Sequence, residues 1–380
     1  MLQLLIGPSG SGKSRYVLDR LAALAATQQE NILWLVPEQH SFESERTLLR
    51  QLGPVAAARV QVLSFSRLAD MVFREVGGMA GERLDEGVRA LLMSCALEQV
   101  AAVAADVDTP MGGLRPRLAT DSAYVAQLLT LWEELRQCAV PTGEWERLAE
   151  ELADTDGQDA LLTEKARDLY RVFTAYEGLA ADTGLDDLDD LSRLAERLPD
   201  SRLPEGAAVF VDGFKGFTVQ ELQVLDRFLP RVSEMTVTLC TDTPGARWPG
   251  TPKEDCRREY TLFSPVTDTV NDLRRLAERH GLAWRLTRLT GNCRTESGAL
   301  QALEAGLYAP APAVYEAPAP EVTVTPCGDV YEECAYVIRR IRYLLRQEGY
   351  RCRDIAVVVR NLPDYQGLLD EMLVGEDIPC

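Results

Sequence analysis

Histidines and long apolar runs are scarce in this sequence, and their scarcity narrows the classes of protein it can belong to. Only two histidines occur in 380 residues, His40 and His280, which disfavours a His-rich metal site or a Ser-His-Asp triad. The sequence lacks a run of about 18 apolar residues, which a membrane-spanning helix would require, and residues 1–6 lack the basic segment of a signal peptide. We therefore expect a cytoplasmic protein that does not associate with membranes.

Paired cysteines are missing as well. Nine cysteines are scattered between Cys95 and Cys380, and none of them forms a C-x-x-C pair. This pattern argues against a zinc ribbon or a disulfide framework and fits a reducing compartment.

Basic residues are outnumbered: 40 Lys and Arg face 59 Asp and Glu, for a net charge of −19. Such a chain repels a polyanion on average, so any contact with nucleic acid must come from a local patch. Residues 182–190 form an acidic run, which we interpret as a solvated face. An arginine run consists of Arg339, Arg340, Arg342, Arg346, Arg351 and Arg353. Its pattern leaves open a solvated helix face and a binding surface.

Strand-like and helical patterns alternate along the first 78 residues. Apolar runs occupy residues 2–6, 31–36 and 60–64, and helical patterns occupy residues 13–26, 43–52 and 65–76. The alternation is typical of an α/β doubly wound sheet. From residue 82 to 199 the spacing of apolar residues becomes helical throughout, and strand-like runs return at 207–211 and 235–240. The simplest topology is one α/β domain interrupted by a large all-helical insertion.

A Pro/Ala-rich segment separates this domain from the rest of the chain. Beyond it we expect a strand at 321–325, a helix at 331–348 and a strand at 355–359, which would begin a second α/β domain of a longer protein. The predicted organisation is a first domain in two parts at 1–81 and 206–307, the helical insertion at 82–205, a linker at 308–320 and the start of the second domain at 321–380.

The first predicted strand leads directly into a complete phosphate-binding motif, G-x-x-x-x-G-K-S. Its residues are Gly7, Pro8, Ser9, Gly10, Ser11, Gly12, Lys13 and Ser14. Glycines allow the backbone to approach phosphate, the lysine supplies a point charge for the β- and γ-phosphates, and the serine hydroxyl is a Mg²⁺ ligand. A strand before the motif and a helix after it supply the required context. The sequence therefore predicts a P-loop that binds ATP with Mg²⁺.

The second half of such a site is an aspartate at the end of another apolar strand. Asp212 follows the run 207–211 and fits this role as a second Mg²⁺ ligand, although it could instead begin an Asp-Gly turn. Gly213 stands where motor ATPases carry a glutamate that orients the attacking water. Slow or absent hydrolysis is the expected consequence, and Glu221 is a candidate substitute.

Several segments together resemble a known family. They are LVPEQHSFESE at 35–45, VQVLSFSRLADMVFREVGG at 60–78, VFVDGFKGFTVQE at 209–221, LTGNCRTESGALQALE at 289–304 and DIAVVVRNLPDYQGLLDEML at 354–373. In this order, and over essentially the whole chain, they resemble AddB, the inactive-helicase and nuclease subunit of the bacterial AddAB helicase–nuclease. The resemblance implies a superfamily 1 helicase layout, with a first RecA-like domain, a helical insertion and the start of a second RecA-like domain.

The resemblance also implies roles for particular residues. Arg294 resembles the motif arginine that reaches the γ-phosphate, with an exposed loop arginine as the alternative. The residues expected to face single-stranded DNA are Glu38, Gln39, Ser41, Phe65 and Arg67, with Phe214 nearby. Alternatively, Phe65 packs beneath the sheet and Arg67 pairs with Glu75 or Asp70. Asp70 itself stands where the family often has an aromatic residue, which weakens the inference that this face recognises the Chi sequence.

For the family as a whole, the resemblance implies a subunit without its own motor. Gly213 and residues 237–241, which lack the Gln-bearing motif of true helicases, agree with this interpretation. An AddA-like partner would supply translocation. The nuclease and the iron–sulfur cluster belong to a C-terminal region that we do not expect in these residues. Two other classes remain open, an active superfamily 1 DNA helicase and a small-molecule P-loop kinase.

Overall fold

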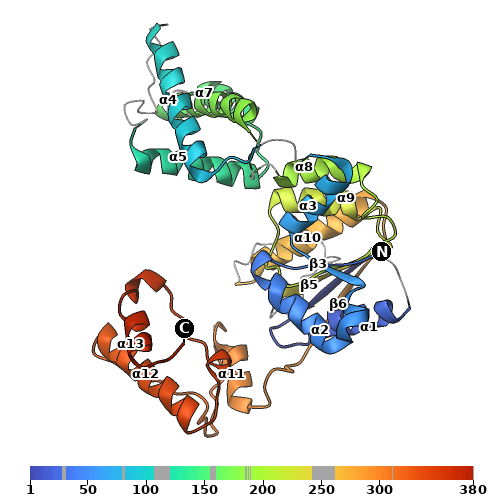
Figure 1. Ribbon diagram of the computed structural model, residues 1–380, viewed down its shortest axis with the longest axis vertical. Coiled ribbons are helices and arrows are strands. Elements are labelled where there is room, and N and C mark those ends of the chain that lie inside the picture. Colours follow the sequence, from blue (N-terminus) through green and yellow to red (C-terminus); the bar gives the residue numbers. More distant parts are fainter. Residues whose placement is uncertain are drawn as a thin grey trace. The chain divides into compact units, whose positions relative to one another are not determined.

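The computed structural model describes residues 1–27, 31–78, 82–106, 120–154, 160–184, 186, 188, 190–241, 262–309 and 311–379. The chain divides into two compact units (Figure 1), which we call unit 1, Met1–Glu296, and unit 2, Ser297–Cys380. None of the described helices combines the length and apolar composition needed to cross a bilayer.

Unit 1 is built on a six-stranded sheet whose paired strands all run parallel. The strands are β1 (Leu2–Gly7), β2 (Ile32–Leu35), β3 (Val60–Leu63), β4 (Ala208–Val211), β5 (Glu234–Cys240) and β6 (Trp284–Arg288), in the spatial order β3-β2-β4-β5-β1-β6. The α/β class predicted from the sequence is confirmed. Because the strands are parallel, their carboxyl ends share one edge, and ligands of open α/β sheets bind at that edge.

Helices cover both faces of this sheet (Figure 1). One face carries α1 (Lys13–Ala26) and α2 (Ser41–Ala57), and the other carries α3 (Phe65–Val76), α8 (Asp190–Arg197), α9 (Val219–Phe228) and α10 (Ser264–Arg279). The alternating side chains of β4 are buried under helices on both faces of the sheet. Ala208 and Phe210 belong to the apolar cluster with α1, and Val209 and Val211 belong to the cluster with α3 on the other face. A strand buried on both faces reads as a continuous apolar run.

The strand β6 differs from the runs predicted from the sequence. Its residues, WRLTR, include two arginines, and all five are intermediate or exposed at the edge of the sheet next to β1. An edge strand with one covered face does not need a continuous apolar run, so the apolar pattern did not reveal it.

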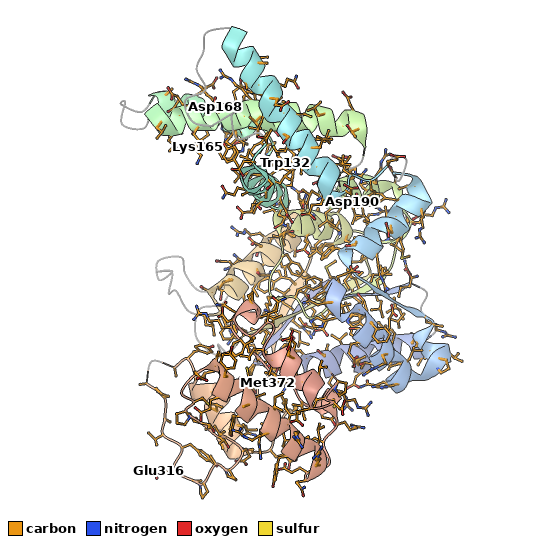
Figure 2. All side chains as sticks on the ribbon, turned by 60° about the vertical axis from the view of Figure 1, so that its left-hand side comes forward. Trp132, Lys165, Asp168, Asp190, Glu316 and Met372 are labelled. Carbon is orange, nitrogen blue, oxygen red and sulfur yellow. The ribbon has the colours of Figure 1, made fainter. Side chains whose placement is uncertain are left out.

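Four further helices follow α3 in the chain and form their own apolar cluster. They are α4 (Glu86–Asp106), α5 (Ser122–Gln137), α6 (Gly143–Asp154) and α7 (Ala160–Thr183). Figure 2 labels Trp132 between them, and its ring centroid lies 5.2 Å from those of Phe173 and Tyr176. Within the predicted insertion 82–205, residues 107–119, 155–159, 185, 187 and 189 lie outside the described residues.

Unit 2 contains α11 (Gly298–Gly306), α12 (Val330–Arg346) and α13 (Leu369–Gly375). Its small core is formed by Ile338, Ile341 and Ile378. The helix predicted at 331–348 is confirmed as α12, but the predictions of strands at 321–325 and 355–359 are wrong for the residues that the structure describes. Val324 and Val358 are each 90% exposed there. Strand propensity reflects packing on a sheet surface, and these segments pair with no strand among the described residues.

Candidate functional site

The loop between β1 and α1 has a backbone that requires glycine. Gly10 and Gly12 have φ values of 81° and 91°, a region that other L-residues rarely adopt. At Gly7, a Cβ atom would lie 2.5 Å from the carbonyl oxygen of Leu289. The loop therefore depends on its glycines both for its turns and for its contact with the segment after β6.

Lys13 lies at the start of α1 and folds over this loop. Its Nζ donates to the carbonyl oxygens of Gly7 at 2.8 Å and Pro8 at 2.7 Å. Burial lowers the pKa of Lys13, Arg294 adds to that effect, and the negative potential of Cys240 and Asp212 opposes it. The helix has no side-chain cap at Gly12, so its first N–H groups retain hydrogen-bonding capacity for an anion.

A cavity of about 500 Å³ opens beside Lys13, and we call it the Lys13 cavity. Its lining comprises Ser9, Gly10, Gly12, Lys13, Ser14, Arg15, Asp212, Gly213, Phe214, Lys215, Thr238, Cys240, Cys293 and Arg294. Residues from four regions of the chain thus meet at the carboxyl edge of the sheet. Arg294 is held there because the preceding N–H, of Cys293, donates to the carbonyl oxygen of Gly10 at 2.7 Å.

Asp212 is buried in this cavity, with 7% of its surface exposed. The hydroxyl of Thr238, on the intervening strand β5, donates a hydrogen bond to its carboxylate. Sequence reasoning identified Asp212 but missed Thr238. The signal was present in the run MTVTLC, where Thr236 and Thr238 are polar residues in a strand that is otherwise apolar and buried.

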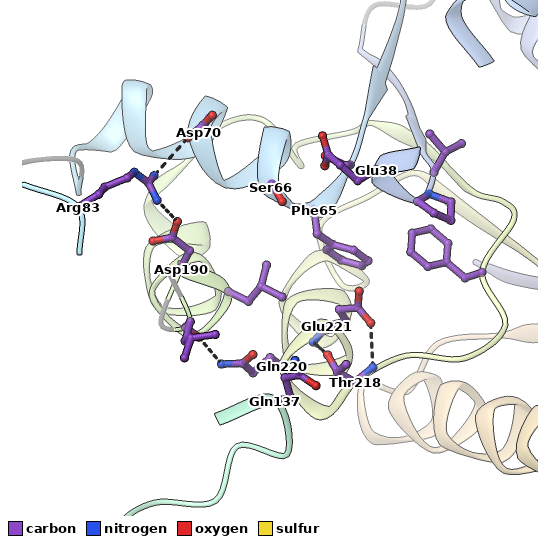
Figure 3. A pocket seen from close by; sticks show the side chains of 16 residues that line it. Glu38, Phe65, Ser66, Asp70, Arg83, Gln137, Asp190, Thr218, Gln220 and Glu221 are labelled. Carbon is purple, nitrogen blue, oxygen red and sulfur yellow. Dashed lines mark hydrogen bonds and ion pairs between the residues drawn. The ribbon is translucent and has the colours of Figure 1, made fainter. Parts of the chain in front are cut away.

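A second cavity, of about 830 Å³, lies at the same edge and is shown in Figure 3; we call it the Glu221 cavity. Its lining comprises Val36, Pro37, Glu38, Ser64, Phe65, Ser66, Asp70, Arg83, Gln137, Leu188, Asp190, Leu191, Phe214, Thr218, Gln220 and Glu221. Of the six residues predicted to face DNA, Glu38, Phe65 and Phe214 line this cavity. Gln39, Ser41 and Arg67 are not among its lining residues.

The aromatic residues of the Glu221 cavity pack on one another. Phe65 is 6% exposed and belongs to the apolar cluster of the sheet. Its ring meets that of Phe214 edge to face at 5.6 Å, and Phe214 in turn lies 5.2 Å from Phe217. In this conformation Phe65 is a core residue, while Phe214 is only partly buried.

The charged residues Arg67 and Asp70 at the predicted DNA face form ion pairs, and the other polar residues there differ in exposure. Arg67 donates to Glu45 at 2.6 Å, so the alternative pairing with Glu75 or Asp70 is wrong. Asp70 lies instead 3.8 Å from Arg83. Ser41 is buried, whereas Glu38 and Gln39 are exposed in the short 3₁₀ helix, Glu38–His40, that precedes α2.

Glu75 lies in the last turn of α3, two turns beyond Arg67. It accepts hydrogen bonds from the Ser201 hydroxyl at 2.5 Å and the Arg202 N–H at 2.9 Å. The Ser201 hydroxyl and then the Arg202 N–H hold the pKa of Glu75 below its usual range.

Glu221 lies in the second cavity and caps a helix there. Its carboxylate accepts from the N–H of Thr218 at 2.8 Å, and its own N–H donates to the Thr218 hydroxyl at 3.2 Å, which forms a capping box at the start of α9. Burial raises the pKa of Glu221, and the hydrogen bonds from Thr218 counter that effect only in part. Among the described residues that line the Lys13 cavity, Asp212 is the one carboxylate.

The fold and site together define a class: an α/β protein with a six-stranded parallel sheet, consistent with a RecA-like layout, and a cavity at its carboxyl edge. The family model described as "ADDB, N-terminal" matches residues 4–304. The chain therefore belongs to the AddB N-terminal family.

Similar curated proteins are each named as the B subunit of an ATP-dependent helicase/deoxyribonuclease. That of Clostridium tetani is 28% identical over 386 residues, that of Moorella thermoacetica is 34% identical over 388, and that of Pelotomaculum thermopropionicum is 34% identical over 383. Each alignment covers 100% of this chain and 32% of the relative. The chain thus spans about a third of the length of the curated relatives it matches.

Proposed function

We propose that this chain is the ATP-binding, non-motor, helicase-like region of a helicase–nuclease subunit that processes broken DNA ends for recombinational repair. The observation that carries the proposal is the Lys13 cavity, where Lys13, Ser14, Asp212 and Arg294 converge from distant parts of the chain. Its volume of about 500 Å³ falls within the usual range of small-molecule sites, about 300–1,000 Å³.

The residues of the cavity fit ATP with Mg²⁺. Lys13 and Arg294 supply positive charge for the phosphates, and the uncapped first turn of α1 supplies N–H donors. The Ser14 hydroxyl and the Asp212 carboxylate face the same cavity and are oxygen donors of the kind that Mg²⁺ prefers. The ion, when bound, neutralises charge on the phosphate oxygens. The thirteen lining residues other than Asp212 include no carboxylate to orient water, which supports negligible hydrolysis and disfavours an active helicase.

The neighbouring face is proposed to contact single-stranded DNA. Glu38, Gln39 and Ser41 follow β2, Phe65 and Arg67 follow β3, and Phe214 follows β4, so all six lie beyond carboxyl ends of adjacent strands. Phe214 is better placed than Phe65 to stack on a base, because it is less buried. We also propose that this face recognises the Chi sequence, on the basis of the family resemblance alone.

The name shared by the relatives supports the assignment to a larger assembly. A protein named as one subunit of a helicase/deoxyribonuclease implies a partner, and we propose an AddA-like helicase–nuclease chain that supplies the motor. The family's nuclease and iron–sulfur cluster are expected outside these residues. A cytoplasmic location remains part of the proposal.

The test is binding of a fluorescent ATP analogue with Mg²⁺ by Lys13→Ala and by Lys165→Ala. Lys165 lies on α7 of the helical segment (Figure 2) and is exposed, so its variant controls for the loss of one positive charge. We expect Lys13→Ala to weaken binding about tenfold or more, because a charge-assisted hydrogen bond contributes about 1.5–3 kcal/mol. Lys165→Ala should bind like the wild type. Equal binding by both variants would remove the basis for a nucleotide site.

A further inference from the structure

The basic residues of unit 2 are confined to one stretch of sequence. All of them are arginines: Arg339, Arg340, Arg342, Arg346, Arg351, Arg353 and Arg360. The rest of unit 2 has acidic residues but neither lysine nor arginine. Positive charge is therefore local in an otherwise acidic unit, which is the arrangement that an acidic chain needs in order to hold a polyanion.

The helix α12 has a buried face and an exposed face, and several of these arginines lie on the exposed one. Cys334, Ile338 and Ile341 are buried, and Figure 1 shows this helix beside α13. The opposite face is fixed by the same helical period. Between residues 336 and 346 it presents Tyr336, Arg339, Arg340, Tyr343 and Arg346 and includes no carboxylate. The exposed Glu332 lies on the same side in the first turn of the helix, before this stretch begins.

Two arginines on this face, Arg339 and Arg346, form no ion pair with the part of the chain that the structure describes. Among the described residues of the unit, Arg339 and Arg346 take part in no hydrogen bond or ion pair, and both are exposed. By contrast, Arg342 pairs with Glu376 and Arg351 pairs with Asp354. On the face itself, Arg340 lies 3.8 Å from Glu348. The carboxylates of the unit thus pair with Arg340, Arg342 and Arg351 and leave Arg339 and Arg346 available.

An aromatic ring lies between the two unpaired cations. Tyr343 follows Arg339 by four residues and precedes Arg346 by three, so the three side chains form one stripe. Tyr343 is 47% exposed, and the guanidinium of Arg340 lies over its ring at 5.0 Å from the centroid. Arg339 and Arg346 are separated by about 10 Å along the helix axis. Ordinary solvated faces mix charges of both signs, whereas this stripe alternates cations with an exposed aromatic ring.

We propose that the α12 face formed by Tyr336, Arg339, Arg340, Tyr343 and Arg346 binds single-stranded nucleic acid. Arg339 and Arg346 contact phosphates, and a base stacks on Tyr343 between them. Cationic grooves with interleaved aromatic rings bind single strands in this way, with little sequence preference. The surface does not depend on the nucleotide site or on the DNA face of unit 1.

The experiment measures binding of a fluorescein-labelled oligothymidine of 20 nucleotides to the full 380-residue chain, by anisotropy over a series of salt concentrations. Arg339→Gln/Arg346→Gln should weaken binding about tenfold and reduce the magnitude of the salt slope by about 1.4, at about 0.7 per single-strand phosphate. Tyr343→Ala should weaken binding about fivefold without changing the salt slope. Tyr343→Phe should bind like the wild type, because the ring rather than the hydroxyl stacks on the base.

The matched control is Arg147→Gln/Arg275→Gln, which removes the same charge from exposed arginines of unit 1. An equal loss in this control and in the α12 variant would overturn the proposal, because bulk charge alone would explain it. So would wild-type binding at background level, or a polyglutamate peptide that binds in an Arg339- and Arg346-dependent way while the oligonucleotide does not. Arg67→Ala distinguishes the proposed DNA face of unit 1 from the α12 face. If Arg67→Ala weakens oligonucleotide binding and Arg339→Gln/Arg346→Gln does not, the unit 1 face is supported and the α12 proposal is overturned.

Discussion

The two cavities at the carboxyl edge of the sheet have opposite charge. Among described residues, the Lys13 cavity is lined by Lys13, Arg15, Lys215 and Arg294 against one carboxylate, Asp212. The Glu221 cavity is lined by Glu38, Asp70, Asp190 and Glu221 against one cation, Arg83. Phe214 contributes to both. One sheet edge can therefore favour phosphate on one side and repel it on the other, so a DNA strand near the Glu221 cavity must present bases rather than phosphates to it.

The largest expected effect tests whether the aromatic wall of the Glu221 cavity belongs to the core. Phe65→Ala removes a ring that is 6% exposed and should lower the free energy of unfolding by about 3–5 kcal/mol. Phe214→Ala should lower the free energy of unfolding by less, because Phe214 is only partly buried. Urea denaturation monitored by circular dichroism measures both. A wild-type midpoint for Phe65→Ala would mean that its ring is not part of the core and is free to stack on a base.

The next effect concerns the carboxylate of the Lys13 cavity. Thr238→Val removes the hydroxyl that donates to Asp212 and should destabilise the fold by about 1–3 kcal/mol, because a buried acceptor loses its donor. Thr236→Val, two residues earlier in the same buried strand, controls for loss of a hydroxyl. The two variants are compared by urea denaturation, and equal effects would contradict a specific role for the Thr238 hydroxyl.

The third prediction tests whether the two cavities act separately in nucleotide binding, by replacing one arginine of each cavity with glutamine. Arg294→Gln should weaken binding of the fluorescent ATP analogue about tenfold, since it removes a charged donor from the phosphate side. Arg83→Gln removes the one cation of the other cavity, where it lies 2.8 Å from Asp190, and should leave nucleotide affinity within about twofold. A larger loss for Arg83→Gln would show that the cavities are not separate in function.

The smallest effect is a pH dependence in the Glu221 cavity. Burial raises the pKa of Glu221, so the folded state holds this proton more tightly than the unfolded chain. The free energy of unfolding therefore falls as pH rises from the ordinary glutamate range through the raised pKa. Glu221→Gln keeps a capping box and should be more stable than wild type above that window by up to about 1 kcal/mol, while the two converge at lower pH.

Urea denaturation at several pH values checks this expectation. Glu196→Gln, at an exposed carboxylate of α8, controls for the loss of one negative charge. A wild-type pH profile for Glu221→Gln would contradict the inference that Glu221 is costly to ionise.

Local sequence predicted the arrangement of residues around Lys13 better than that of the residues proposed to face DNA. The strand, the glycines and the helix of residues 2–26 are contiguous, so one motif specified them together. Asp212 was predictable because an apolar strand ends beside it. The pairing of Arg67 with Glu45 and the burial of Phe65 against Phe214 depend on segments brought together only by the sheet, and no local pattern encodes them. The prediction of strands in unit 2 was wrong for the same reason. A segment with high strand propensity forms a strand only where another strand lies beside it, and propensity does not show whether one does.

The strand order has a consequence for how the protein is made. β1 pairs with β5 and β6, whereas β2 pairs with β3 and β4. The partners of β1 begin at Glu234 and Trp284, so the ribosome adds more than 200 residues before either partner is complete. At about 5–20 residues per second this takes roughly ten to fifty seconds. Throughout that time the first strand and its glycine loop lack their native neighbours, and the Lys13 cavity is among the last parts of unit 1 to assemble.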